Sequence, residues 1–166
     1  MTSSSFSRRG DIASFLAMDV MREANQLQQT GQNICHLEVG QPSTKAPQVV
    51  LDAARYAIDS ELIGYTDALG LDDLRQALSA YYHMTYKVDV APERFVITTG
   101  SSAGIILAFL ACLDAGQKVA VTTPGYPAHT NIIQSLDLTP VTIALGQENN
   151  WTLTTDDLRD AEKTHG

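Results

Sequence analysis

The sequence predicts an α/β fold with a mostly parallel sheet covered by helices. From Arg94 onward, short segments rich in β-branched residues alternate with helical patterns, in the order β-α-β-α-β and then a last helix. This alternation is typical of parallel strands joined by crossover helices. The 166 residues are 44% hydrophobic and 18% charged, a composition that suits a folded domain with its own core.

Residues 1–10 are expected to be a disordered tail, and a helix is expected after them. Apolar residues recur at steps of three and four between Asp11 and Gln29, which predicts one buried helical face. Asp11 is the expected N-cap and Gly31 the expected stop. Further along, the patterns predict a strand over 34–39, a helix over 48–59 and a helix over 72–82 that is capped by Asp72.

The second half of the chain carries the α/β alternation. Strands are expected over 94–99, 118–123 and 140–145, and helices over 103–113, over 129–135 and from 156 onward. Cys35 and Cys112 each lie in an apolar stretch, and we expect both to be reduced core residues, as suits a cytoplasmic protein.

Composition and charge argue against several classes of partner. The formal net charge of -8 disfavours a nucleic acid or an anionic membrane as partner, because these need a basic face. The longest apolar run, Ile105 to Leu113, is far shorter than a membrane span, and no secretory signal is expected at the N-terminus. The four histidines have no spacing that suits a metal, so we expect no metal site and interpret them as structural or solvated.

The segment Gly100–Gly104, with the sequence GSSAG between an expected strand and an expected helix, suits a phosphate group. A helix N-terminus offers unpaired N–H groups and a partial positive charge, and small residues let a phosphate approach the backbone. The hydroxyls of Ser101 and Ser102 can add hydrogen bonds. The alternative is a tight turn in which one of these serines only caps the helix.

Three other loops offer weaker signals. Pro124-Gly125-Tyr126-Pro127 follows a strand and holds an aromatic stiffly enough to stack on a flat ring; the alternative is a turn whose tyrosine covers a core edge. Gly40 follows an expected strand, and its bare Cα suits close approach of a ligand, or it only ends the strand. Tyr65 lies in a polar loop that is otherwise a surface turn.

Taken together and in order, four segments resemble class I/II aminotransferases of fold type I, which use pyridoxal 5′-phosphate (PLP). The resemblance covers the chain from about Asp11 to its end. The chain corresponds to a little under half of a typical member of the family. The segments are Leu37-Glu38-Val39-Gly40-Gln41-Pro42, Tyr65–Gly70 with Leu74-Arg75 following, Val96–Gly104, and Pro124-Gly125-Tyr126-Pro127.

The resemblance implies a role for each matching residue. In the family, the loop that matches Gly100 to Ala103 binds the PLP phosphate, an aromatic residue stacks on the pyridine ring, and a tyrosine reaches the phosphate of the neighbouring active site in a homodimer. These roles fall on Ser101, Ser102 and Ala103 for the phosphate, Tyr126 for the ring, and Tyr65 for the neighbouring site. The family glycine beside the substrate α-carboxylate matches Gly40.

The implied activity is transfer of an amino group from an amino acid to a 2-oxo acid. In family terms, residues 11–45 would be the N-terminal helix and strand of the small-domain or arm region, and residues 46–166 an incomplete PLP-binding large domain. The family's Schiff-base lysine lies beyond the matched segment, and Lys45, Lys87, Lys118 and Lys163 do not correspond to it. We therefore expect no catalytic residue and no independent activity in residues 1–166.

Two other functions remain open on the sequence. The chain would serve as a non-catalytic module that binds PLP or another phosphate, or that mediates an interaction. Alternatively it belongs to another fold-type I PLP enzyme, such as a lyase or synthase, because these reactions use the same wall of the cofactor site.

Overall fold

Residues 7–166 are described by the computed structural model, which divides them into two units. The first unit joins residues 7–23 to residues 100–166, and the second comprises residues 24–99. Of the expected tail, residues 1–6 lie outside the described residues, whereas Arg8–Gly10 form a turn of 3₁₀ helix, η1. The assignment of 11–45 and 46–166 to family domains stays a prediction.

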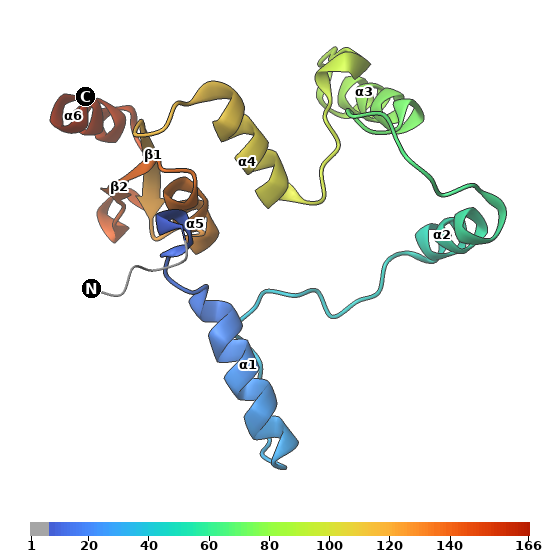
Figure 1. The fold of residues 1–166 in the computed structure, drawn as a ribbon, viewed down its shortest axis with the longest axis horizontal. Helices are drawn as coiled ribbons and strands as arrows, with labels where there is room; N and C mark the ends of the chain where they lie inside the picture. Colours follow the sequence, from blue (N-terminus) through green and yellow to red (C-terminus); the bar gives the residue numbers. More distant parts are fainter. Residues whose placement is uncertain (1–6) are drawn as a thin grey trace. The chain divides into compact units, whose positions relative to one another are not determined.

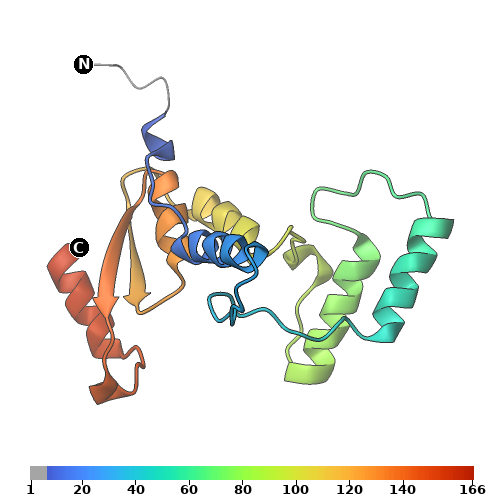
Figure 2. The same cartoon turned by 90° about the horizontal axis from the view of Figure 1, so that it is seen from below.

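The first unit is built on a two-stranded parallel sheet. Its elements are α4 (Ser101–Cys112), β1 (Lys118–Thr123), α5 (Pro127–Ser135), β2 (Thr139–Ala144), η3 (Gln147–Asn149) and α6 (Thr155–His165). The strands pair in register from Lys118 opposite Thr139 to Thr123 opposite Ala144. Helix α5 crosses between them, and Figures 1 and 2 show α5 on one side of the sheet and α6 on the other. The predicted α/β class with parallel strands and flanking helices is confirmed.

The core of the first unit lies where α5 meets the sheet. Ile133 is fully buried, and its buried neighbours on α5, on the following turn and on β2 are Ile132, Leu138, Val141 and Ile143. The turn from α5 into β2 is closed by backbone bonds: the Gly116 N–H donates to the Asp137 carbonyl at 2.7 Å, and the Leu138 N–H donates to the Ile133 carbonyl at 3.0 Å. The first bond ties this turn to the loop before β1, and the second closes the C-terminal end of α5.

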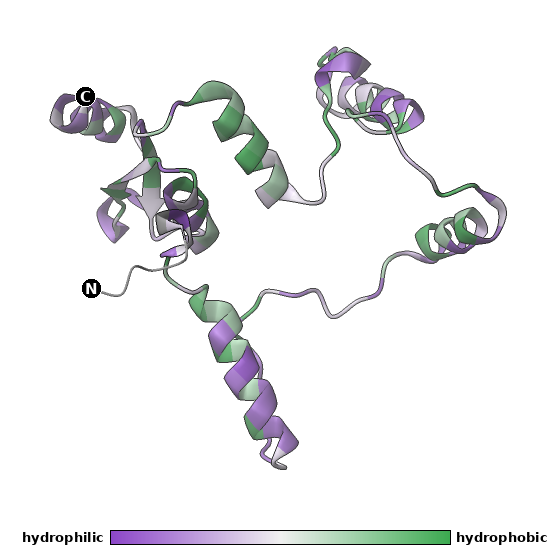
Figure 3. Cartoon of the chain, viewed as in Figure 1, coloured by the Kyte–Doolittle hydropathy of each residue, from purple (hydrophilic) through white to green (hydrophobic). Residues whose placement is uncertain are grey.

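After its first turn, helix α4 is apolar on every side, as its hydrophobic colouring over most of its length in Figure 3 shows. None of its residues is buried, and Leu110 is 62% exposed. Cys112, at its end, and Cys35 are both exposed, so the prediction that they are core residues is wrong. Apolar neighbours in the sequence indicate burial only where a second layer packs over them, and the described residues supply no such layer.

Two predicted strands, over 34–39 and over 94–99, do not form among the described residues. Phe95 has extended dihedrals (φ -95°, ψ 134°), and the Ile97 N–H donates to the Leu69 carbonyl at 3.0 Å, but no strand pairs alongside. The β-branched composition of these segments favours an extended backbone. A strand also needs a neighbour to complete its hydrogen bonds, so the extended backbone remains without a ladder.

The second unit contains α2 (Gln48–Ser60), α3 (Asp72–Tyr86) and η2 (Pro92–Arg94), and α1 (Leu16–Gln29) begins in the first unit and ends in the second. Helix α3 packs on η2 through Tyr82, whose ring centroid lies 5.4 Å from that of Phe95. The Ser79 hydroxyl donates to the Val90 carbonyl at 2.6 Å. The loop before α3 contacts the segment before α4 where Gly70, with φ +96°, lies against Ile97.

Several helix ends differ from expectation. Helix α1 begins at Leu16, so Asp11 is not its N-cap, whereas Gly31, with φ +90°, ends it as predicted. Asp72 is the first residue of α3 rather than its cap, and its carboxylate instead accepts hydrogen bonds from Arg75 at 3.1 Å and Gln76 at 2.5 Å. An acidic side chain stabilises a helix both at the N-cap and in the first turn, where it interacts with the helix dipole. The residue type alone therefore does not show which of these two positions Asp72 occupies.

Candidate functional site

The loop between β1 and α5 holds the most structured part of the candidate site. Pro127 is the first residue of α5 and Tyr126 its N-cap residue, with φ -75° and ψ 114°. Pro is well suited to the first helical position because its fixed φ matches the helix and its missing N–H is not needed there. A Cβ at Gly125 would overlap the Thr122 carbonyl oxygen, so only glycine fits this turn.

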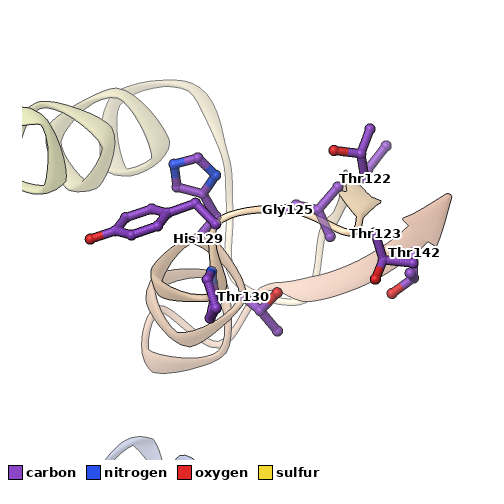
Figure 4. A pocket seen from close by; sticks show the side chains of 10 residues that line it. Thr122, Thr123, Gly125, His129, Thr130 and Thr142 are labelled. Carbon is purple, nitrogen blue, oxygen red and sulfur yellow. The ribbon is translucent and has the colours of Figure 1, made fainter. Parts of the chain in front are cut away.

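A hollow of about 450 Å³ opens beside this loop, at the carboxyl end of β1. Figure 4 shows Thr122, Thr123 and Thr142 contributed by the strands and His129 and Thr130 by α5. The lining residues are Ala120, Val121, Thr122, Thr123, Gly125, Tyr126, Pro127, His129, Thr130 and Thr142. In open α/β sheets, ligands bind at this end of the strands.

The Tyr126 ring has two aromatic neighbours, both in edge-type geometry. The Phe15 ring centroid lies 5.8 Å away with an interplanar angle of 76°, and the His129 ring lies 5.3 Å away at 83°. Neither neighbour stacks parallel on the Tyr126 ring, and Tyr126 is 54% exposed. The ring is therefore held in place and still accessible, which suits stacking on a flat ligand.

The predicted phosphate loop lies at the start of α4. Gly100 is the N-cap residue, with φ +101° and ψ 169°, and Ser101, Ser102 and Ala103 form the first turn. Because Gly100 occupies the cap position, the alternative in which Ser101 or Ser102 caps α4 does not hold. The first N–H groups of an α-helix have no acceptor within the helix, so this turn offers donors to an anion.

The structure places the two halves of the predicted site in one unit without joining them in one cavity. Helix α4 contacts α5, which begins directly after Tyr126. The hollow beside Tyr126, however, is not lined by Ser101, Ser102 or Ala103. The role of each as a cofactor contact stays a prediction.

Tyr65 and Gly40 belong to the second unit. Tyr65 lies in the loop between α2 and α3 with its side chain fully exposed. Gly40 is exposed too, and a Cβ built on it would meet nothing within 4 Å, so the packing around it does not require glycine. Their predicted contacts with a neighbouring active site and with substrate stay predictions.

The sequence interpretation missed His129, which it took as structural or solvated. His129 lines the hollow and contacts the Tyr126 ring. The signal was present, because residues three apart at the start of a helix share one face, and Pro127 marks that start. The threonines of the strands were missed because Thr reads as an ordinary strand residue.

Within residues 7–166, no helix combines the length and the apolar character that a membrane span requires. Within the same residues, no group of three or more His, Cys, Asp or Glu side chains is arranged to hold a metal ion.

A parallel-stranded unit with a ligand-sized hollow at its strand ends and an open helix N-terminus is typical of α/β proteins that bind phosphorylated cofactors. Residues 32–165 match the family described as Aminotransferase class I and II. The chain belongs to this family.

Named relatives agree with this assignment. The chain is 42% identical over 143 residues to a valine–pyruvate aminotransferase of Mycobacterium tuberculosis, covering 86% of this chain and 37% of the relative. It is 31% identical over 120 residues to an aspartate aminotransferase of Pyrococcus horikoshii, covering 72% of this chain and 31% of the relative.

Solved structures show the same fold. A crystal structure of an aminotransferase from Mycobacterium tuberculosis matches with a TM-score of 0.90 and 39% identity, covering 95% of this chain and 41% of that one. An alanine aminotransferase from Pyrococcus furiosus matches with a TM-score of 0.85 and 27% identity, covering 93% of this chain and 40% of that one. The chain thus spans between about a third and two fifths of the length of these relatives and structures.

Proposed function

We propose that the first unit forms the ring-stacking and phosphate-binding wall of a PLP-dependent aminotransferase, which transfers an amino group from an amino acid to a 2-oxo acid. The observation that carries this proposal is the Tyr126 ring, fixed by Pro127 and two aromatic neighbours beside the hollow at the end of β1. A flat heteroaromatic ring on Tyr126 would gain both apolar contact and favourable ring geometry.

The start of α4 supplies what the phosphate needs. Three successive small residues, Ser101, Ser102 and Ala103, let an anion approach the backbone N–H groups, and two of them add a hydroxyl. The positive φ of Gly100 turns the chain into the helix at this point. The partial positive charge of a 12-residue helix at its N-terminus favours the phosphate dianion.

The residues present fit the phosphate and ring of PLP, and they do not include a lysine for a covalent bond at the hollow. No lysine lines it, and the Nζ of Lys118 donates instead to the His165 carbonyl. When bound, PLP supplies an electrophilic carbonyl and an electron sink. The residues of this chain bind and orient that group, and we propose no catalytic residue among them.

The substrates, assembly and location follow from the family as further proposals. An amino acid and a 2-oxo acid are the proposed substrates. The two relatives reported above are named as a valine–pyruvate aminotransferase and an aspartate aminotransferase. The fully exposed Tyr65 side chain is free to reach a second subunit, which supports a homodimer. Gly40 would lie against the substrate carboxylate, and the proposed location is the cytoplasm.

Equilibrium dialysis of PLP against the full chain tests the proposal. We expect saturable binding that Tyr126→Ala weakens about tenfold, since loss of an aromatic contact of about 1.4 kcal/mol corresponds to that factor. Tyr56→Ala is the matched control, because Tyr56 is 68% exposed on α2 and does not line the hollow. Absence of saturable binding, or equal affinities of the two variants, would refute the proposed wall.

A further inference from the structure

The segment that precedes α1 is fixed on α5 rather than extending freely. The Arg9 Nε lies 2.7 Å from the Asp137 carboxylate in the turn after α5. The Asn131 side-chain amide, on α5, donates to the Ala13 carbonyl at 3.2 Å. Figures 1 and 2 show η1 beside α5, in agreement with these contacts.

The third contact of this segment is with Tyr126 itself. Phe15, the last residue before α1, is half-buried, and its ring meets the Tyr126 ring at a centroid distance of 5.8 Å. The two anchors, an ion pair at Arg9 and a hydrogen bond to the Ala13 carbonyl, differ in chemistry from this ring contact. The position of Phe15 is therefore determined by the segment and does not depend on Tyr126 alone.

We propose that Phe15 is a positioning residue for Tyr126. The contact restricts the tyrosine rotamers, so that the ring is already held beside the hollow that Tyr126 lines before a ligand arrives. An exposed aromatic without such a neighbour loses rotamer entropy on binding, and orienting it beforehand removes that loss from the binding free energy. The inference rests on the proposed stacking of Tyr126 on a cofactor ring.

Solution NMR of the full chain with labelled tyrosine tests the contact without any ligand. Ring currents from Phe15 should shift the Tyr126 ring resonances, and Phe15→Ala should move them toward random-coil positions. Leu16→Ala is the control, because Leu16 is the next residue, is 70% exposed and forms no aromatic pair. Tyr126 resonances that are unchanged in Phe15→Ala would overturn the inference whether or not the chain binds PLP.

Binding of two probes by the same variants tests the consequence. Phe15→Ala should weaken PLP binding roughly two- to tenfold, the range expected for one aromatic pair, and leave binding of inorganic phosphate unchanged. Phe15→Tyr should restore PLP affinity, because it keeps the ring. In the double variant Phe15→Ala with Tyr126→Ala, the loss should not exceed that of Tyr126→Ala alone.

The outcomes separate the inference from the proposed function. If the unaltered chain binds no PLP, the proposed function fails, and the NMR shifts still decide whether Phe15 orients Tyr126. If PLP binds and Phe15→Ala shifts the Tyr126 resonances without loss of PLP affinity, the positioning role fails alone. Equal weakening of PLP and inorganic phosphate binding also contradicts it, because that result indicates a general loss of structure.

Discussion

Replacing Gly70 by alanine should destabilise the second unit through two separable effects. Gly70 has φ +96°, a conformation that costs an L-residue about 1–2 kcal/mol. The new Cβ would also lie 2.5 Å from Cγ1 and 2.6 Å from Cβ of Ile97, and overpacking of this kind costs roughly 1–3 kcal/mol. Together the two effects should lower the free energy of unfolding by roughly 2–5 kcal/mol. They act at the contact between the loop before α3 and the segment before α4.

Gly31→Ala provides a control that contains only the first effect. Gly31 has nearly the same backbone conformation, with φ +90°, but a Cβ there would meet nothing within 4 Å. We therefore expect Gly31→Ala to cost about 1–2 kcal/mol, less than Gly70→Ala. The difference between the two variants isolates the overlap with Ile97.

Urea unfolding monitored by two probes measures both variants. Near-ultraviolet circular dichroism of the tyrosine cluster Tyr81, Tyr82 and Tyr86 reports on the second unit, whereas fluorescence of Trp151, the one tryptophan in the sequence, reports on the first. Linear extrapolation then gives the free energy of unfolding for each probe. Gly70→Ala should move the tyrosine transition and leave the tryptophan transition in place.

A double variant decides whether the overlap is real. Ile97→Ala removes Cγ1 and leaves Cβ, which the new Cβ would still approach to 2.6 Å, so it relieves part of the overlap and should cost less in the Gly70→Ala background than in the unaltered chain. Equal losses for Gly70→Ala and Gly31→Ala, together with additive behaviour of Gly70→Ala and Ile97→Ala, would refute the packing argument.

Two further predictions concern the first unit. Gly125→Ala should reshape the turn after β1, because its Cβ would overlap the Thr122 carbonyl, and should weaken PLP binding about as much as Tyr126→Ala in the same dialysis measurement. Thr154→Ala should lower the stability of α6 by about 1 kcal/mol, seen as reduced helical circular dichroism, because it removes the capping box with Asp157. Hydrogen bonds from the Thr154 hydroxyl and backbone N–H lower the pKa of Asp157 below its usual 3.8. This contribution should be complete above that pH and be lost as the pH falls through the lowered pKa. A Thr154→Ala chain keeps only the backbone hydrogen bond, so its acid-side loss should be smaller.

Local signals predicted the helices and the two strands that have a partner. The strand over 118–123 was predicted to the residue, and that over 140–145 with a shift of one residue, because each carries β-branched residues and is bounded by turns. Helix α2 extends one residue past its predicted end, and α4 begins two residues earlier than expected. Such ends depend on capping geometry, which composition does not fix.

The strands that did not form show what local sequence leaves undetermined. The segment around Ile97 has the composition of a strand and begins with an extended backbone, yet a ladder depends on a second strand that the sequence of the segment cannot supply. The same reasoning applies to Cys35 and Cys112, whose apolar surroundings predicted burial. Burial depends on a covering layer, which is a tertiary property.

The candidate site was predicted unevenly for a related physical reason. Gly125, Tyr126 and Pro127 were identified because a glycine and prolines flanking an aromatic residue are a local turn signal, and the structure forms that turn with Pro127 as the first residue of α5 and no room for a Cβ at Gly125. Phe15 lies 111 positions before Tyr126, and no periodicity links the two residues, so only the folded chain reveals their contact. Residues that make a site are thus accessible to sequence reasoning where they act through the local backbone. Residues that orient them from a distant segment are found from coordinates, and the proposed role of Phe15 is of this second kind.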